Sequence, residues 1–228
     1  MKRWMISTLV MCALALPTKA QQFVGYVNVH IYAGDNLIAN MLNSAPDNTL
    51  DNVLQGGVLT GSTFTEWNPV SDQLLPVSVF NGTSWSINYN LSLNETGGVL
   101  HSPGNTTVTF VGQMLNYDLN AGKSTYVPPT YNPGTYLLGY PVPVSTASFQ
   151  DIIGRNPQQG DAVTLLNATT QTYTTTTFLD GTWNHGVPSI PIGQAGYFDL
   201  AIPEPSSCAV LCAGVMVFII SRRFLGRR

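Results

Sequence analysis

The stretch TTQTYTTTTF at residues 169–178, followed by Asp180-Gly181-Thr182-Trp183, decides the fold class of this chain. Threonine, tyrosine and phenylalanine are β-branched or aromatic residues, which favour extended strands. Asp-Gly is a strong tight-turn signal because these residues tolerate a positive φ angle. The stretch therefore predicts a strand that ends in a reversal of the chain.

The turn and its tryptophan occur a second time, 99 and 98 residues earlier, as Asn81-Gly82-Thr83-Ser84-Trp85. Phe23-Val24-Gly25 also matches Phe110-Val111-Gly112, at an offset of 87 residues. Three further matches keep their order at offsets of 98 to 100 residues: Gly34-Asp35-Asn36-Leu37-Ile38 with Gly134-Thr135-Tyr136-Leu137-Leu138, Leu50-Asp51-Asn52-Val53-Leu54 with Phe149-Gln150-Asp151-Ile152-Ile153, and Thr96-Gly97-Gly98-Val99-Leu100 with Gln194-Ala195-Gly196-Tyr197-Phe198. Such self-similarity indicates an internal repeat. We predict two β-rich copies, at residues 21–109 and 110–202.

Each copy is expected to consist of short strands and one short helix. Strands are predicted at 23–32, 60–67, 73–80, 106–111 and 169–178. Helices are predicted at 48–55 and 148–154, where Asn48 and Ser148 are N-cap residues before apolar residues at helical spacing. Pro128-Pro129 and Asn132-Pro133-Gly134 mark the intervening segment as a loop. The fold class is therefore all-β. The copies form one sandwich or barrel, which we favour, or two small domains.

Charge is scarce and unevenly distributed in the 228 residues. Charged residues make up 9% of the chain, about a third of the roughly 25% typical of soluble domains. The hydrophobic share of 44% separates the chain from disordered proteins. Residues 21–202 hold eleven carboxylates but only Lys123 and Arg155, a formal charge of −9. Nucleic-acid binding depends on basic residues that neutralise phosphates, so this composition excludes nucleic acid as a partner.

Residues 1–20 have the pattern of a secretory signal peptide. Lys2 and Arg3 precede an apolar run at 4–16, and Thr18-Lys19-Ala20 offers small residues where signal peptidase cleaves. The mature chain would then begin at Gln21, whereas an uncleaved N-terminal anchor is the alternative. The three cysteines, Cys12, Cys208 and Cys212, lie in the two end segments, so the body has no disulfide.

The last 26 residues, 203–228, combine three features in a fixed order. Pro203, Glu204 and Pro205 come first, an apolar run follows at 208–220, and the chain closes with Arg222, Arg223, Arg227 and Arg228. A helix over this run spans about 20–22 Å, short of the roughly 30 Å hydrocarbon core, but it lodges in a membrane when the arginines snorkel. Arginines remain on the cytoplasmic side, so they predict a membrane stop and place the body outside the inner membrane.

This tail resembles the PEP-CTERM sorting signal of Gram-negative bacteria, in which a Pro-Glu-Pro triplet precedes an apolar helix and a basic end. The resemblance covers residues 203–228 and does not extend to the body. It implies that an exosortase-like membrane protease recognises the tail transiently and cuts near Pro203-Glu204-Pro205. It also implies a surface or extracellular destination and an association with biofilm matrix. A plain C-terminal anchor with a chance triplet is the alternative.

No pattern in the body predicts catalysis. His30 lies in a predicted strand, His101 in a predicted turn, and neither they nor His185 have the spacing of a metal site. No Gly-x-Ser-x-Gly segment marks a hydrolase nucleophile, and Glu66 and Glu95 do not form a recognisable glycosidase pair. We therefore predict no catalytic residue, no metal and no cofactor.

Aromatic residues are the candidates for a binding surface. Trp67, Trp85 and Trp183 are candidate glycan contacts, because indole rings stack on sugar rings; core packing is the competing interpretation for Trp85 and Trp183. The sequence as a whole predicts an exported, non-enzymatic surface or matrix protein with a structural or adhesive role. Its candidate partners are signal peptidase, the exosortase-like protease and an exopolysaccharide. A carbohydrate-binding module is the alternative, and a polysaccharide-acting enzyme comes third.

Overall fold

A computed structural model describes residues 24–202, except 55, 94–96, 116, 119–120 and 122. The expected signal peptide at 1–20 and the expected sorting tail at 203–228 lie outside these residues. Short antiparallel strands dominate the described part, with two helices of four and five residues, so the all-β prediction is confirmed. Within the described residues, no helix has the length and apolar character needed to traverse a membrane.

The first half, residues 24–115, is built on an antiparallel sheet with the strand order β2-β6-β3-β4, in which β5 also pairs with β3. A separate ribbon formed by β1 and β7 packs against it, together with helix α2. The elements are β1 (Val24–Ile31), β2 (Gly34–Ala39), α2 (Leu50–Val53), β3 (Thr63–Asn68), β4 (Gln73–Leu74), β5 (Ser78–Val79), β6 (Gly97–Ser102) and β7 (Thr106–Gln113).

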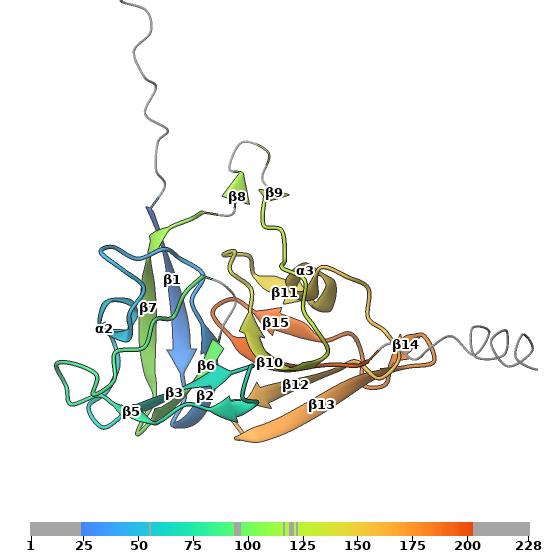
Figure 1. The fold of residues 1–228 in the computed structure, drawn as a ribbon. Coiled ribbons are helices and arrows are strands. Elements are labelled where there is room, and N and C mark those ends of the chain that lie inside the picture. Colours follow the sequence, from blue (N-terminus) through green and yellow to red (C-terminus); the bar gives the residue numbers. More distant parts are fainter. Residues whose placement is uncertain are drawn as a thin grey trace, which may run out of the picture.

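The second half, residues 123–202, has a sheet with the order β10-β16-β12-β13-β14, and a short β11–β15 pair packs beside helix α3. Figure 1 shows the β1–β7 ribbon and α2 on one side of the molecule and α3 with β11 and β15 on the other. The elements are β10 (Gly134–Gly139), β11 (Thr146–Ser148), α3 (Phe149–Ile153), β12 (Ala162–Asn167), β13 (Thr172–Leu179), β14 (Thr182–Trp183), β15 (Ser189–Pro191) and β16 (Ala195–Leu200). Strands β8 (Tyr117–Asp118) and β9 (Lys123–Ser124) form a small hairpin between the halves.

The two sheets share their strand order and their register. Strands β2, β6 and β3 pair as β10, β16 and β12 do, and the pair Asp35–His101 occupies the position of Thr135–Asp199. The hairpin turns also correspond, because Asn68 and Asn167 each accept hydrogen bonds from the backbone N–H groups two and three residues later. The copy boundary expected at 109/110 falls inside β7, which pairs with β1.

Three hydrophobic clusters follow from the alternation of side chains along the strands. The first core lies between the first sheet, the β1–β7 ribbon and α2, and contains Phe64, Leu100 and Phe110. The second core lies between the second sheet, α3 and β15, and contains Phe149 and Phe198. The central core lies between the two sheets and is formed by Leu37, Ala39, Trp67, Val99, Leu137, Leu166, Ala195 and Tyr197.

Several predicted details differ from the structure. The N-cap position of helix α2 is Thr49, whose side chain makes no capping bond, and not Asn48, whose side chain accepts the N–H of Ser44. Helix α3 has the predicted cap, a capping box between Ser148 and Asp151. His101 lies in β6 and not in a turn, because it pairs with Asp35 on one side and Thr63 on the other. The strand predicted at 73–80 is interrupted around Pro76, which cannot donate to a ladder.

Candidate functional site

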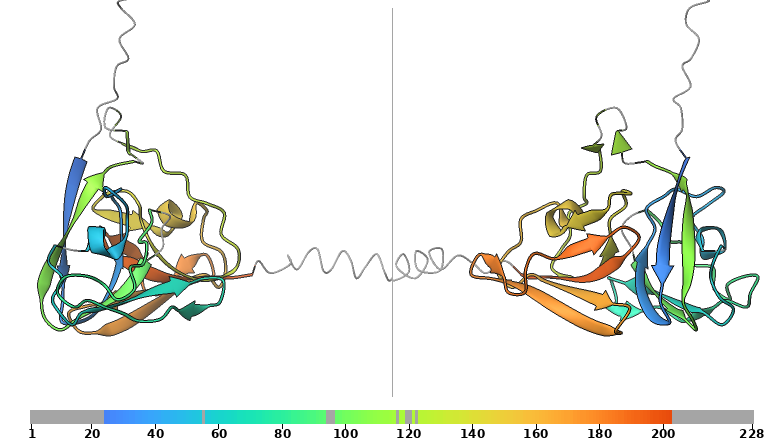
Figure 2. Two further views of the ribbon diagram at one scale, coloured as in Figure 1. Left: turned by 60° about the vertical axis from the view of Figure 1, so that its left-hand side comes forward. Right: turned by 180° about the vertical axis from the view of Figure 1, so that it is seen from behind.

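The junction of the two halves is the part of the molecule to which both halves contribute functional groups. Its centre is the central core, where small residues allow the sheets to approach closely: a Cβ atom added at Gly97 would lie 2.6 Å from the Cβ of Ala195. The Trp67 indole N–H donates to the carbonyl of Thr135 over 3.0 Å, and the backbone N–H of Ala39 donates to Gly193. The two views of Figure 2 show the two sheets lying against each other at this junction.

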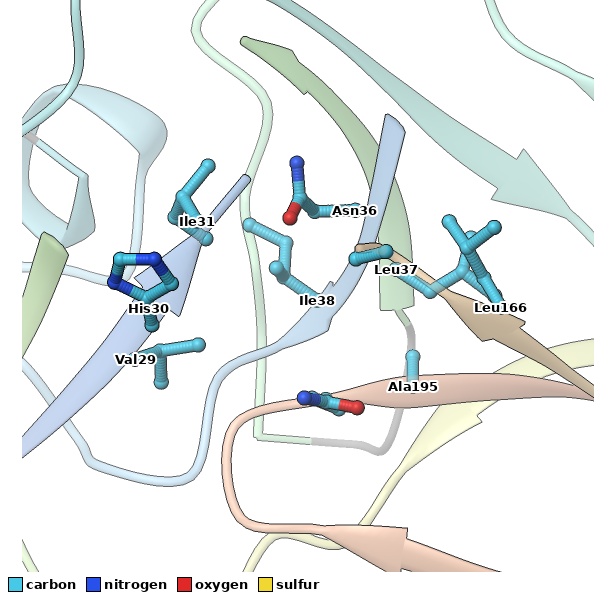
Figure 3. Close-up of a pocket in the computed structure, with 10 residues that line it drawn as sticks. Val29, His30, Ile31, Asn36, Leu37, Ile38, Leu166 and Ala195 are labelled. Atoms are coloured by element: carbon cyan, nitrogen blue, oxygen red, sulfur yellow. The ribbon is translucent and has the colours of Figure 1, made fainter. Parts of the chain in front are cut away.

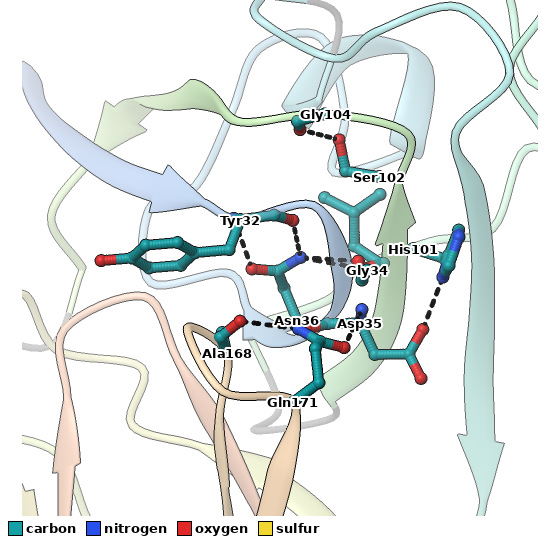
Figure 4. Close-up of polar contacts among 10 residues, drawn as sticks. Tyr32, Gly34, Asp35, Asn36, His101, Ser102, Gly104, Ala168 and Gln171 are labelled. Atoms are coloured by element: carbon teal, nitrogen blue, oxygen red, sulfur yellow. Dashed lines mark hydrogen bonds and ion pairs between the residues drawn. The ribbon is translucent and has the colours of Figure 1, made fainter.

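A polar rim borders this junction at the start of β2. The Asp35 carboxylate lies 2.7 Å from Nδ1 of His101 across the β2–β6 pair. Gln171, from the β12–β13 turn, accepts the backbone N–H of Asp35 at 2.7 Å and donates to its carbonyl at 3.0 Å (Figure 4). A residue 136 positions away in sequence therefore fixes the backbone that carries Asp35.

Two tyrosines of the second half complete the rim. Burial, and after it the neighbouring Tyr173 and Asp35, together raise the pKa of Tyr197 to about 12. Burial also raises the pKa of Tyr173, with Asp35 as a second cause. Both phenols therefore stay neutral at physiological pH, and they are available as hydrogen-bond donors and acceptors. The rim offers a carboxylate, an imidazole and phenols, whereas the Gln171 amide is used in bonds to Asp35 and Ala168.

The chemistry open to Asp35 and His101 is limited by exposure. Their side chains are 44% and 54% exposed, so water screens the pair. Within the described residues, no serine or threonine hydroxyl is hydrogen-bonded to the other ring nitrogen of His101, where a triad would place its nucleophile. The pair orients two polar side chains at a sheet edge and can bind a polar ligand by hydrogen bonds.

A small pocket lies near the rim, between β1, β2 and the start of β16. Val29, His30 and Ile31 line one wall, and Leu37, Leu166 and Ala195 line the other (Figure 3). Its free volume is about 10 Å³, room for one water molecule. Asn36, which also borders it, is buried and uses its side chain to bond Tyr32 and Gly34. The pocket is therefore too small for a sugar or a cofactor.

The three tryptophans predicted as glycan contacts lie in three different clusters. Trp85 is 5% exposed in the first core and packs against Phe64 and Phe80. Trp183 packs against Phe149 and Phe178 beside the second core. Trp67 packs edge-on against Tyr197 in the central core. The structure does not bring these rings onto a common face.

The other predicted residues are also dispersed. His30 lies on the outer face of β1 with its ring edge against Tyr32, and His185 lies in an exposed loop after β14. Among the residues that the structure describes, no three His, Cys, Asp or Glu side chains are close enough to bind a metal ion. The sorting motif Pro203, Glu204 and Pro205 and the membrane stop Arg222, Arg223, Arg227 and Arg228 lie outside the described residues.

Sequence reasoning missed two polar residues of the second half, Gln171 and Asp161, whose side chains bond distant parts of the chain. Gln171 bridges the halves, and the buried Asp161 accepts Arg155 at 2.6 and 3.1 Å as well as the N–H groups of Gln158 and Ala201. Burial opposes ionisation of Asp161, but these hydrogen bonds outweigh it and lower its pKa. At an offset of 99 residues, Gln171 corresponds to Asp72, and both residues have a positive φ angle.

The chain matches no protein-family model, no curated protein and no solved structure. Its function is therefore inferred from its own residues and contacts.

Proposed function

We propose that this chain is an exported surface or extracellular-matrix protein with a structural or adhesive role, and not an enzyme. Its body would be two copies of one β-rich unit, packed face to face through the central core. The matching strand order, register and Asn-centred turns of the two sheets support the duplication. A signal peptide at 1–20 would export the chain, and the PEP-CTERM-like tail would present it to an exosortase-like protease.

The use of carboxylates is the observation that carries the proposal. Catalysis by acids requires carboxylates that face a substrate. Five carboxylates of the described body instead support the fold: Asp161 pairs with Arg155, Asp151 caps α3, and Asp51 accepts the backbone N–H of Trp85. Asp199 likewise accepts the hydroxyl of Thr135, and Asp47 accepts the N–H of Thr49.

The exposed surface suits a hydrated polymer environment. Strand β13 carries five threonines among its eight residues, and four consecutive positions from Thr172 to Thr175 are exposed. Uncharged hydroxyl groups form many weak hydrogen bonds with water and with sugars, whereas Trp67, Trp85 and Trp183 pack in or against the hydrophobic clusters. A scaffold with this surface fits a structural role in a matrix.

Intact-mass measurement on protein from the native host, with fractionation of inner membrane, outer surface and medium, tests the proposal. We expect a chain that begins at Gln21, ends near residues 203–205 and is found outside the inner membrane. Additional mass on the new C-terminus would indicate covalent attachment to matrix. Persistence of the whole tail in the inner membrane would overturn the proposed sorting and the matrix role.

A glycan array separates a structural protein from a carbohydrate-binding module. The structural proposal expects no tight binding to an isolated polymer. Specific binding that is lost on replacing Tyr173, the exposed aromatic residue of the rim, would instead favour the module. The matched control is Tyr26→Ala, because Tyr26 is exposed on β1, far from Tyr173 in the sheet order.

A further inference from the structure

The two sheets differ at corresponding edges, which are formed by β4 and β5 beside β3 in the first half and by β13 beside β12 in the second. In the first half, Leu74 lies opposite Trp67 and Ser78 opposite Phe64. Three residues of this edge, 75–77, therefore face two residues of β3, which is a β-bulge, and Pro76 lies within it. A bulge and a proline are the devices by which proteins prevent a sheet edge from pairing with another chain.

The corresponding edge of the second half has neither device. Strand β13 pairs with β12 in unbroken register from Thr172 to Thr177, and two residues face two between Tyr173 and Thr176. Strand β14 covers only the far end, where it pairs with Phe178 and Leu179. Figure 1 and the right view of Figure 2 both show β13 along the rim of the molecule.

Backbone groups of Tyr173 and Thr175 point away from the sheet at this edge. Thr177 directs its carbonyl and N–H to the β14 side, where they bond the N–H and side chain of Asn184. Backbone direction alternates along a strand, so Tyr173 and Thr175 present their N–H and C=O groups on the same side. Within the described residues, these outward-pointing N–H and C=O groups of Tyr173 and Thr175 have no hydrogen-bond partner.

Charge indicates which partner fits this edge. The body has eleven carboxylates and two basic residues, so copies of it repel one another over most of their surface. Residues 162–179, which include β12 and β13, contain no acidic or basic residue. A second copy can therefore pair its own β13 with this strand without bringing a carboxylate of either strand into the ladder.

We propose that β13 is a self-association site, at which the strand pairs antiparallel with β13 of a second copy about a two-fold axis at Thr174. Tyr173 of one chain then lies opposite Thr175 of the other and exchanges both main-chain hydrogen bonds with it, four bonds in all. Thr174 lies opposite its own copy, and the Tyr–Thr pairs are of the aromatic–β-branched kind that stabilises sheets. The two sheets become continuous across the contact.

The lengths of the elements suit this register. A two-fold axis at Thr174 places Thr172, the first residue of β13, opposite Thr176 of the second copy. The pairing therefore stops at Thr176, before Phe178, where β14 pairs with this edge. This inference does not depend on export or on the matrix role, because it uses only the edge of the folded body.

Sedimentation velocity of the full chain in a fixed excess of detergent micelles, over a wide concentration range, tests the pairing. We expect a reversible dimer, with amide hydrogen exchange at Tyr173 and Thr175 slowing as concentration rises. Thr175→Pro removes two of the four hydrogen bonds in the dimer and should raise its dissociation constant about thirtyfold. It leaves the β12 ladder intact, because the N–H of Thr175 points outward. Thr175→Val keeps the N–H and is the matched control.

A charge exchange at the two-fold axis tests the register without touching the backbone. Thr174→Lys and Thr174→Glu each place like charges opposite one another and should weaken their own dimers about threefold. A mixture of the two variants should associate more tightly than either alone. A monomer at every concentration, or association that is unchanged by Thr175→Pro and Thr174→Lys, would overturn the proposal, since the tail and all other surfaces are common to these proteins.

Discussion

The two halves of the body have matching sheets but place different side chains at one corresponding position of these sheets. Ser62 and Asp161 correspond, because their carbonyls accept the N–H groups of Phe80 and Phe178 in matching ladders. Both side chains are buried, yet the Ser62 hydroxyl has no hydrogen-bond partner within the described residues, whereas Asp161 accepts Arg155 and two backbone N–H groups. One backbone arrangement therefore tolerates either a small unpaired hydroxyl or a satisfied ion pair.

Strand order and polar stabilisation are therefore separate properties of this unit. The shared features are turns, register and apolar alternation, which determine the sheet. The unshared features are local devices: the buried ion pair and capping box occur in the second half, and the bulge with Pro76 occurs in the first. Substitutions that exchange or remove these devices test this separation.

The largest effect is expected at the buried ion pair. Asp161→Ser installs the residue of the first half and leaves Arg155 and two backbone donors without their acceptor. We expect a loss of about 3 kcal/mol in the free energy of unfolding, measured by urea denaturation. Ser62→Ala is the matched variant and should change it by less than about 0.5 kcal/mol, because it removes a hydroxyl that has no partner. Equal losses in both variants would contradict the comparison.

Acid should remove the same stabilisation. The folded-state pKa of Asp161 is lowered, so its contribution is complete above the unfolded value of about 3.9 and is lost as pH falls through the lower folded value. The stability difference between the natural chain and Asp161→Ser should be constant from pH 7 to about pH 5 and shrink below about pH 4. Urea midpoints from pH 7 to pH 2.5 measure it. A difference independent of pH would mean that the carboxylate charge does not matter.

A methyl exchange across the central core tests the packing of one half on the other. Ala39 and Gly139 correspond, and a Cβ atom at Gly139 would overlap that of Ala39 and lie 2.8 Å from the carbonyl of Gln194. Gly139→Ala should therefore cost about 1–3 kcal/mol of stability. The double variant with Ala39→Gly should recover part of this loss, because it removes the methyl–methyl overlap. Calorimetry of the three variants measures it, and strict additivity would contradict a direct contact.

The smallest effect is expected at the helix caps. Ser148→Ala breaks the capping box of α3, in which Ser148 accepts the N–H of Asp151, and should cost about 1 kcal/mol. Thr49→Ala at the equivalent position of α2 should cost less, because the Thr49 side chain makes no capping bond. Thermal unfolding of both variants provides the measurement. A larger loss for Thr49→Ala would show that the caps do not differ as their hydrogen bonds indicate.

Local patterns predicted much of the fold. The β-branched run at 172–179 forms β13, and Asp180-Gly181 forms the turn with positive φ at both residues. Pro76 marks the break between β4 and β5, because proline has no N–H to donate to a sheet ladder. His101 was expected in a turn but lies in β6, where the preceding glycines allow close packing: a Cβ atom at Gly98 would overlap Phe64.

The candidate site was less predictable. The sequence shows that Trp85 and Trp183 correspond and that Trp67 stands apart. It does not show that each ring packs in a different hydrophobic cluster. The bond between Gln171 and Asp35 joins residues 136 positions apart, and no local pattern marks it. Alternation along a strand defines two faces without saying which partner covers each.

The all-β class, the turns and the position of α3 follow from the sequence, because they depend on neighbouring residues and their φ preferences. The central core shared by the two sheets, the hydrogen bonds that satisfy the buried Asp161 carboxylate, and the open edge of β13 emerge from the three-dimensional packing. These properties arise from contacts between residues about a hundred positions apart. Their free energy depends on shape and on the direction of backbone groups, which spacing along the chain does not specify.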